Sequence, residues 1–342
     1  MRRPPGLRAV AFLLSLVAVI LGSLPAGVRA AENVTLILNA PPSGLHAGII
    51  YTQRRGFYTR AGLVVTIERG RGSSRTIRSV VKRQKAFGLG ELAAVIESRT
   101  EGVDTAGLAL LVERFPGSVI ALKGSGIRSP ADLKGRRLAG PVASFSRILF
   151  PYFAERAGLN LDSVRWSDIG AASGIRALLR GEADAVVTSE TVRWRYERAA
   201  ARKKKQIVAF PYAKYGIEVY GLSLVAPVRL IREEEGLVRR MVEATVRGVA
   251  EAMARPAEAL DLFRRTFPEH PARGAEAEWR VFLGSWSPGG LKRPGLGFFR
   301  KDRVARLQAL LIRGRQLTRE FSPRRFFTNR VVPKVSVRPA SF

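Results

Sequence analysis

One stretch, residues 34–70, constrains the fold of this chain more than any other. Its apolar, β-branched start predicts a short strand over 34–38, and a loop with two prolines follows over 39–44. A helix is then expected up to Gly56, and a second strand over 64–67. Open α/β sheets hold ligands at loops that leave the carboxyl end of a strand and open into a helix. Asn39, Ser43 and His46 are therefore candidate ligand-binding residues.

The same stretch carries a recurring pattern, with HAG at 46–48, GFY at 56–58 and GLVV at 62–65. It resembles the periplasmic solute-binding proteins of ABC importers that are related to thiamine-pyrimidine synthesis enzymes and to nitrate, sulfonate and taurine binders. The turn at 124–135 and the closing segment 326–330 resemble the same family. The resemblance implies an α/β type-II periplasmic binding protein fold, in which two lobes joined by a two-crossing hinge hold a ligand between them.

The amino terminus has the layout of a secretory signal peptide over residues 1–30. Three arginines precede an uncharged run over 9–28, which ends in the small-residue site Val28-Arg29-Ala30. The strongly apolar core, residues 9–21, is shorter than the roughly 20 residues that a membrane-spanning helix needs. We therefore expect cleavage near Ala30 or Ala31 and a periplasmic mature protein, with a membrane anchor as the alternative.

Composition excludes several kinds of chemistry. The chain has no cysteine, which excludes disulfides, thiolate metal sites and cysteine nucleophiles. Its formal net charge is +30, which could indicate nucleic-acid binding. The basic residues are scattered along the chain, however, with one compact run at 202–205 and no nucleic-acid motif. We expect a basic surface that attracts anions and membrane surfaces in general, and no nucleic-acid partner.

The resemblance also implies a division of the chain. The first lobe is expected over 31–122 and 221–333, the second lobe over 123–220, and a loose basic tail over 334–342. In the second lobe, a strand over 137–140 leads through a loop into a helix that starts at Arg147. Like residues 34–56, this segment is a strand followed by a loop that opens into a helix. The expected fold would turn that loop toward the first lobe.

The predicted strands and loops bring the remaining candidate ligand residues toward the space between the lobes. They are Ser73, Ser74, Arg75, Glu91, Ser144, Phe145, Ser146, Arg147, Glu190 and Tyr220. Ser73 or Ser74 can cap a helix whose free N–H groups favour an anion or another acceptor. Glu91 and Glu190 each follow a strand, on opposite lobes. Each glutamate should have a donor partner, because a buried unpaired carboxylate is costly.

Two ligand classes stay open at this point. The glutamates suit an aminated ligand such as a pyrimidine precursor of thiamine, which needs acceptors and aromatic faces. Arg75 and Arg147 suit nitrate or an aliphatic sulfonate instead, or they could pair with the two glutamates. We prefer the aminated ligand. Alternatively, each glutamate serves only as a negative charge in the first turn of a helix, where it complements the helix dipole.

The case for an enzyme is weak at the sequence level. The chain has only two histidines, His46 and His270, and His270 is expected to be exposed in a loop. There is no triad or metal cluster, and the cysteine-rich iron-binding stretch that the resemblance would imply for a synthase is missing. We predict no catalysis and no cofactor. The expected role is to capture a solute for a membrane permease, as a monomer, with a sensor domain or a secreted enzyme as alternatives.

Overall fold

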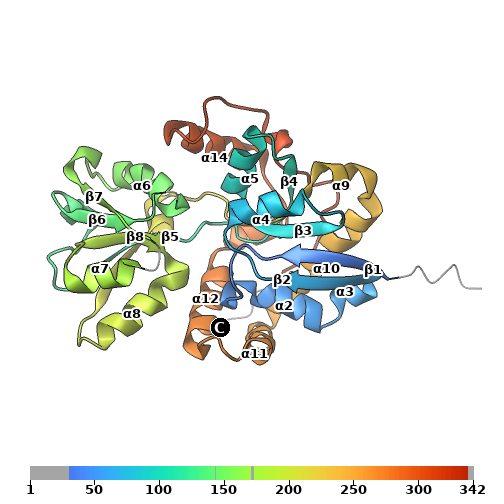
Figure 1. Ribbon diagram of the computed structural model, residues 1–342, viewed down its shortest axis with the longest axis horizontal. Coiled ribbons are helices and arrows are strands. Elements are labelled where there is room, and N and C mark those ends of the chain that lie inside the picture. The colour runs from blue at the N-terminus through green and yellow to red at the C-terminus, as the bar shows by residue number, and fades with distance from the viewer. Residues whose placement is uncertain (1–30, 143, 171–172, 338–342) are drawn as a thin grey trace, which may run out of the picture.

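A computed structural model gives the structure of this protein and describes residues 31–142, 144–170 and 173–337. Two five-stranded sheets, each flanked by helices, form two lobes that lie side by side (Figure 1). This is the α/β, two-lobe architecture that the sequence predicts. The predicted signal peptide lies outside the described residues, and residues 334–337 of the expected tail form neither helix nor strand.

The first sheet has the strand order β2-β1-β3-β10-β4. Its strands are β1 (Glu32–Ile37), β2 (Leu63–Glu68), β3 (Ala86–Glu91), β4 (Thr105–Leu110) and β10 (Leu222–Pro227). β1 pairs in parallel with β2 and β3, whereas β10 runs antiparallel to β3 and β4. The chain therefore leaves the first lobe after β4 and returns to complete its sheet with β10.

The second sheet has the order β7-β6-β8-β5-β9. Its strands are β5 (Gly117–Leu122), β6 (Arg137–Gly140), β7 (Arg165–Asp168), β8 (Ala185–Ser189) and β9 (Ile207–Pro211). The sequence analysis placed 117–122 in the first lobe, and the structure corrects this. β5 pairs antiparallel with both β8 and β9, so its backbone hydrogen bonds belong to the second sheet. The first crossing between lobes thus lies before Gly117 and not near Leu122.

Helices cover both sheets (Figure 1). The helices of the first lobe are α2 (Ala47–Arg54), α3 (Phe57–Arg60), α4 (Ser73–Val80), α5 (Leu92–Thr100), α9 (Val228–Glu233), α10 (Glu235–Ala254), α11 (Pro256–Thr266), α12 (Ala272–Gly284), α13 (Pro288–Lys292) and α14 (Lys301–Arg313). Those of the second lobe are α6 (Phe145–Arg156), α7 (Gly174–Arg180) and α8 (Arg193–Ala201). α12 and α14 also reach the second lobe, where α12 contacts α8 and α14 contacts α6.

The long helix α10 forms much of the first lobe's core. Val238, Met241, Val242, Val249 and Met253 recur at helical spacing and are all buried, as that spacing predicts. α10 packs against α2, and Gly248 permits their close approach. A Cβ added at Gly248 would come within 2.4 Å of the Thr52 hydroxyl oxygen. A side chain larger than hydrogen at this position would force the two helices apart.

Two short segments join the lobes, residues 111–116 between β4 and β5 and residues 216–221 between η6 (Tyr212–Tyr215) and β10. They pair with each other: Phe115 N–H donates to the Val219 carbonyl at 2.8 Å, and Gly221 N–H donates to the Val112 carbonyl at 3.0 Å. The hinge is thus a two-stranded ribbon, as expected for a fold with two crossings.

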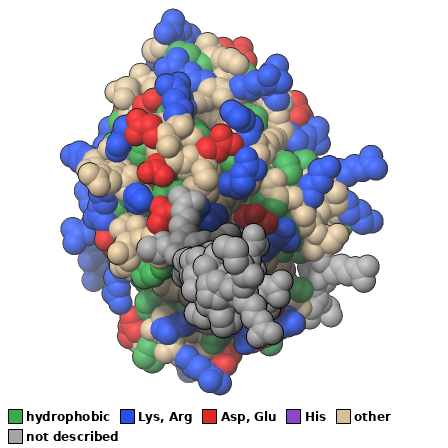
Figure 2. Space-filling model, turned by 90° about the vertical axis from the view of Figure 1, so that its right-hand side faces the viewer, with side chains coloured by type: hydrophobic (Ala, Val, Ile, Leu, Met, Phe, Trp, Pro, Cys, Tyr) green, Lys and Arg blue, Asp and Glu red, His purple; other side chains and the backbone are tan. Residues whose placement is uncertain are grey.

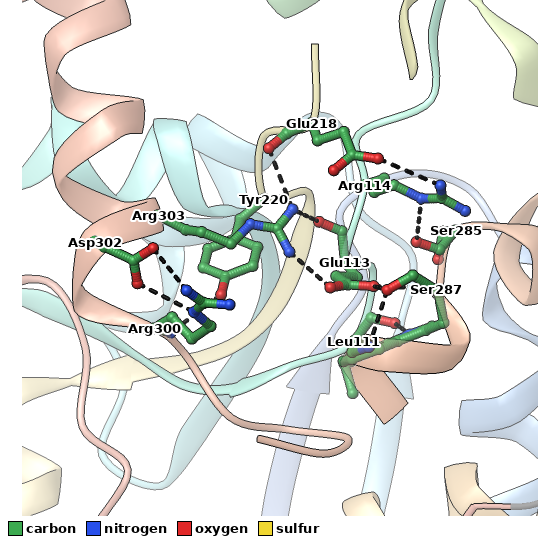
Figure 3. Close-up of polar contacts among 12 residues, drawn as sticks. Leu111, Glu113, Arg114, Glu218, Tyr220, Ser285, Ser287, Arg300, Asp302 and Arg303 are labelled. Carbon is green, nitrogen blue, oxygen red and sulfur yellow. Dashed lines mark hydrogen bonds and ion pairs between the residues drawn. The ribbon is translucent and has the colours of Figure 1, made fainter. Parts of the chain in front are cut away.

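Arg303 of α14 clamps this ribbon (Figure 3). Its guanidinium pairs with Glu113 at 2.6 Å and donates to the Glu218 carbonyl at 3.1 Å, so it touches both crossing segments. It also lies over the Tyr220 ring, 4.4 Å from its centroid. The Glu113 carboxylate accepts two further hydrogen bonds, from the backbone N–H and the hydroxyl of Ser287. Both side chains of the ion pair are buried, with 12% and 8% of their area exposed.

Basic side chains are spread over the face of the molecule that Figure 2 shows, with acidic side chains among them. Several arginines pair with a carboxylate one helical turn away, as Arg239 does with Glu235 and Arg247 with Glu243. Such exposed pairs contribute little to stability. On this face the positive charge is distributed and does not form one compact patch.

The hinge clamp generates a stability prediction. We expect Arg303→Ala to lower the free energy of unfolding by about 3–5 kcal/mol, because it leaves the Glu113 carboxylate buried without its cation. Urea unfolding followed by circular dichroism measures this change. Arg306→Ala removes an exposed arginine from the same helix and should change stability by less than about 0.5 kcal/mol. Equal effects of the two substitutions would contradict the clamp.

Candidate functional site

A cavity of about 630 Å³ lies between the lobes. It brings together seven of the predicted ligand residues, Ser73, Ser74, Arg75, Glu91, Ser144, Phe145 and Ser146. The first three begin α4, Glu91 ends β3, and the last three lead from β6 into α6. The cavity thus lies where loops at the carboxyl ends of strands face each other across the lobes. Arg71, Glu97 and Phe115 also line it, and the sequence analysis did not single them out.

Two carboxyl oxygens on the first-lobe wall have no partner in the part of the chain that the structure describes. The Oε2 atom of Glu91 and the Oε1 atom of Glu97 are buried and have no hydrogen-bond partner among the described residues. The expectation of a donor for Glu91 is therefore not met within the described chain. Burial raises the pKa of Glu91 to about 8. Burial, followed by the nearby charge of Glu101, raises the pKa of Glu97 to about 7.

These carboxyl groups can serve a ligand in either protonation state near neutral pH. A carboxylate accepts hydrogen bonds, and a protonated carboxyl donates one and accepts others. The edge of an aminopyrimidine, with an amine beside a ring nitrogen, offers a donor next to an acceptor. A protonated carboxyl complements that edge with two hydrogen bonds. This is the chemistry that the first-lobe wall can supply.

The basic groups at the cavity differ in their surroundings. Arg71 and Arg75 are exposed, and neither has an ion-pair partner in the part of the chain that the structure describes. Arg147 was predicted to bind an anion or to pair with a cleft glutamate, and it pairs with a different carboxylate. Its guanidinium pairs with Asp168, donates to the Gly140 carbonyl at 3.0 Å and lies 4.2 Å from the centroid of the Trp166 ring. Partners within the second lobe thus hold Arg147 there.

Asn39, Ser43 and His46 form a cluster of their own in the loop between β1 and α2. The Ser43 backbone N–H donates to His46 Nδ1 at 3.1 Å, so Nδ1 carries no proton and Nε2–H donates to Asn39 Oδ1 at 2.9 Å. The His46 side chain is buried, and that burial lowers its pKa to about 4. His46 is therefore neutral with a fixed tautomer. It orders the loop and does not line the cavity.

The same loop is tied to the second lobe through Glu278 of α12. This buried carboxylate accepts from the Gly44 backbone N–H at 2.7 Å, from Trp194 Nε1 at 3.1 Å and from His270 Nε2 at 3.0 Å. Trp194 belongs to α8, so one carboxylate joins both lobes. The expectation that His270 is exposed is wrong, because its side chain is only 12% exposed and bonds to Glu278.

Two predicted ligand residues lie elsewhere. Tyr220 is buried at the hinge, where its hydroxyl accepts from the Arg300 backbone N–H at 3.0 Å. Glu190 lines a separate cavity of about 270 Å³ that also contains Arg114. One of its carboxyl oxygens pairs with Arg193 at 3.4 Å, and the other is buried without a partner among the described residues. Phe115 lines both this cavity and the larger one that contains Glu91.

The chain belongs to the NMT1/THI5 like family, whose model matches residues 44–259. The match begins in the β1–α2 loop and extends through the second lobe to α11. This confirms the resemblance that the sequence analysis drew from the HAG and GFY segments.

Several characterised proteins are similar to this chain at low sequence identity. The 4-amino-5-hydroxymethyl-2-methylpyrimidine phosphate synthase of Legionella pneumophila is 24% identical over 70% of this chain and 75% of its own. The riboflavin-binding protein RibY of Chloroflexus aurantiacus is 23% identical over 88% of this chain and 86% of its own. The formylaminopyrimidine-binding protein of Halalkalibacterium halodurans is 24% identical over 68% of this chain and 70% of its own.

A solved structure has the same fold. The periplasmic aliphatic sulphonate binding protein SsuA from Escherichia coli superposes with a TM-score of 0.69, covering 86% of this chain and 96% of that one, at 14% identity. At this identity the likeness concerns the fold. It confirms the two-lobe periplasmic binding protein architecture.

The relatives overturn one expectation. The sequence analysis predicted that this chain is not an enzyme, yet relatives within the family are named as synthases. Membership of the family therefore does not exclude catalysis. Within the described residues, no three His, Asp or Glu side chains are grouped so that they could hold a metal ion. In the same part of the chain, no helix has the length and apolar character to cross a bilayer.

The raised pKa of Glu91 makes stability depend on pH. Between the ordinary glutamate pKa of about 4.3 and the folded value of about 8, the folded protein holds a proton that the unfolded chain has released. The free energy of unfolding therefore falls as pH rises through this window. We expect this fall to be shallower in Glu91→Gln, by up to about 1.4 kcal/mol per pH unit.

Urea unfolding between about pH 5 and pH 8 measures the slope. Glu320→Gln, which removes an exposed acid far along the chain, serves as the matched control and should keep the wild-type slope. A Glu91→Gln slope equal to that of the wild type would show that the Glu91 carboxyl is ionised throughout this range.

Proposed function

We propose that this chain is the periplasmic solute-binding component of an ABC importer, and that it binds an aminated pyrimidine between its lobes. The observation that carries the proposal is the pair of buried carboxyl groups, Glu91 and Glu97, that face the cavity without a partner among the described residues. An unpaired buried polar group costs free energy, and a ligand amine with its neighbouring ring nitrogen would remove that cost.

The family and two of its named relatives support the ligand class, because one relative binds a formylaminopyrimidine and another is named for a pyrimidine phosphate. On this proposal the signal peptide over residues 1–30 delivers the protein to the periplasm. The mature protein acts as a monomer and passes its ligand to a permease in the inner membrane.

A second candidate is an anion such as nitrate or an aliphatic sulfonate. It is favoured by Arg71 and Arg75, which stand exposed at the cavity beside the first turn of α4. Guanidinium groups bind such oxyanions through charge-assisted hydrogen bonds. The two candidates differ in the residues on which binding depends, so substitutions separate them.

Calorimetry with 4-amino-5-hydroxymethyl-2-methylpyrimidine, its formylamino analogue and an alkyl sulfonate tests the proposal. We expect a pyrimidine to bind and Glu91→Ala to weaken its binding about tenfold or more, because the substitution removes both the donor and the acceptor of the protonated carboxyl and each hydrogen bond is worth about 0.5–1.5 kcal/mol. Arg75→Ala should change pyrimidine binding by less than threefold or so on the same scale. Glu320→Ala, at an exposed position, is the control for the loss of an acidic side chain.

The contrary result is equally clear. If the sulfonate binds, and Arg75→Ala abolishes that binding while Glu91→Ala keeps it, the anion candidate replaces the pyrimidine. Mass spectrometry of the ligand recovered after incubation with the protein completes the test. A changed ligand mass would show that the protein catalyses a reaction as well as binding.

A further inference from the structure

A third cavity, which none of the predicted ligand residues lines, lies between α8 and α12. This groove has a volume of about 870 Å³. Its walls come from different lobes, since α8 lies on the second and α12 on the first (Figure 1). The residues that matter for its chemistry are Trp194, Pro271 and Ala272, which are apolar, and Arg198, Arg202 and Arg273, which are basic.

The groove carries uncompensated positive charge. Arg198, Arg202 and Arg273 are exposed, and none of them pairs with a carboxylate in the described ranges. Glu197 also lines the groove, but it is bound to Arg193 at 2.8 Å. The exposed basic run 202–205 follows directly after the carboxyl end of α8. These arginines are therefore available to bind an anionic partner.

Trp194 gives the groove a rigid aromatic wall. Its indole N–H is held by Glu278 at 3.1 Å. Its ring lies against Gly274, where an added Cβ would come within 2.5 Å of the ring atoms. The ring is still partly exposed toward the groove, and Arg195 lies over it at 5.3 Å from the centroid. A fixed tryptophan surrounded by arginines is the composition typical of the energetic centre of a protein interface.

We propose that the α8–α12 groove is a docking site for an acidic segment of a partner protein. Carboxylates of that segment pair with the arginines of the groove, and an apolar side chain between them packs on Trp194. Arginine clusters recognise acidic motifs in this way in other interfaces. A protruding segment fits because the site is concave, whereas a membrane surface is flat and would meet only the rim.

The position of the groove adds a consequence. Because α8 and α12 belong to different lobes, the partner contacts both lobes at once. A change of the angle between the lobes moves one wall of the groove against the other. The docking site is therefore complete only in a restricted range of lobe positions, whichever ligand occupies the cleft.

Fluorescence anisotropy with a fluorescein-labelled peptide of repeated Glu-Glu-Leu tests the proposal on the full mature chain at physiological salt. We expect Arg198→Glu/Arg202→Glu to weaken binding about a hundredfold, since each lost charge-assisted pair accounts for about tenfold. The control, Arg306→Glu/Arg324→Glu, makes the same change of charge at exposed positions outside the groove. It should weaken binding by roughly a few fold at most, because it lowers only the overall positive charge that attracts the acidic peptide.

Three outcomes would overturn the proposal. Equal losses in the two double variants would assign binding to net charge alone. Unchanged peptide binding in the groove variant would show that the groove is not the site. Loss of binding to phosphatidylglycerol vesicles, with peptide binding kept, would assign the arginines to a lipid surface. Circular dichroism of both variants checks that they fold.

Discussion

The ion pair between Glu113 and Arg303 is the interaction on which the arrangement of the two lobes depends. It joins a helix near the carboxyl terminus to both segments of the hinge, since the same guanidinium also reaches the Glu218 carbonyl. A buried ion pair is stable only when its remaining hydrogen-bonding groups are satisfied. Ser287 meets that condition for Glu113 through its N–H and its hydroxyl. The hinge beside the cavity therefore includes contacts from this late part of the chain.

The cavity between the lobes combines two unlike walls. On one side, the buried carboxyl oxygens of Glu91 and Glu97 await a donor from outside the described chain. On the other side, Ser144 and Ser146 offer small polar groups beside the Phe145 ring. The aminated pyrimidine proposed above would suit both walls, because its polar edge would meet the carboxyl groups and its face the aromatic ring.

Local patterns predicted much of the fold. The β-branched run over 34–38 and the helical spacing of Val238, Met241 and Val249 are short-range signals, and the structure confirms them. The sheet that β5 joins could not be read from its own residues, because strand pairing depends on partners far along the chain. Seven cleft residues were found because each lies within a strand–loop–helix unit that the sequence displays.

The remaining site residues depended on contacts that no local pattern carries. Glu278 binds groups from Gly44, Trp194 and His270, and nothing in the helix around it distinguishes it from an exposed acid. Arg147 was placed in the cleft because of its position at the start of a helix, and Asp168 from another strand draws it away. Glu97 was missed because its burial follows from the packing of α5. Long-range partners therefore decide which charged side chains remain available to a ligand.

If the proposed function is correct, a solute bound between the lobes draws them together about the hinge. Small-angle X-ray scattering, with the pyrimidine that calorimetry identifies, measures this directly. We predict a smaller radius of gyration at saturating ligand than in the free protein, because closure of two lobes makes the molecule more compact. An unchanged radius of gyration at saturation would contradict it.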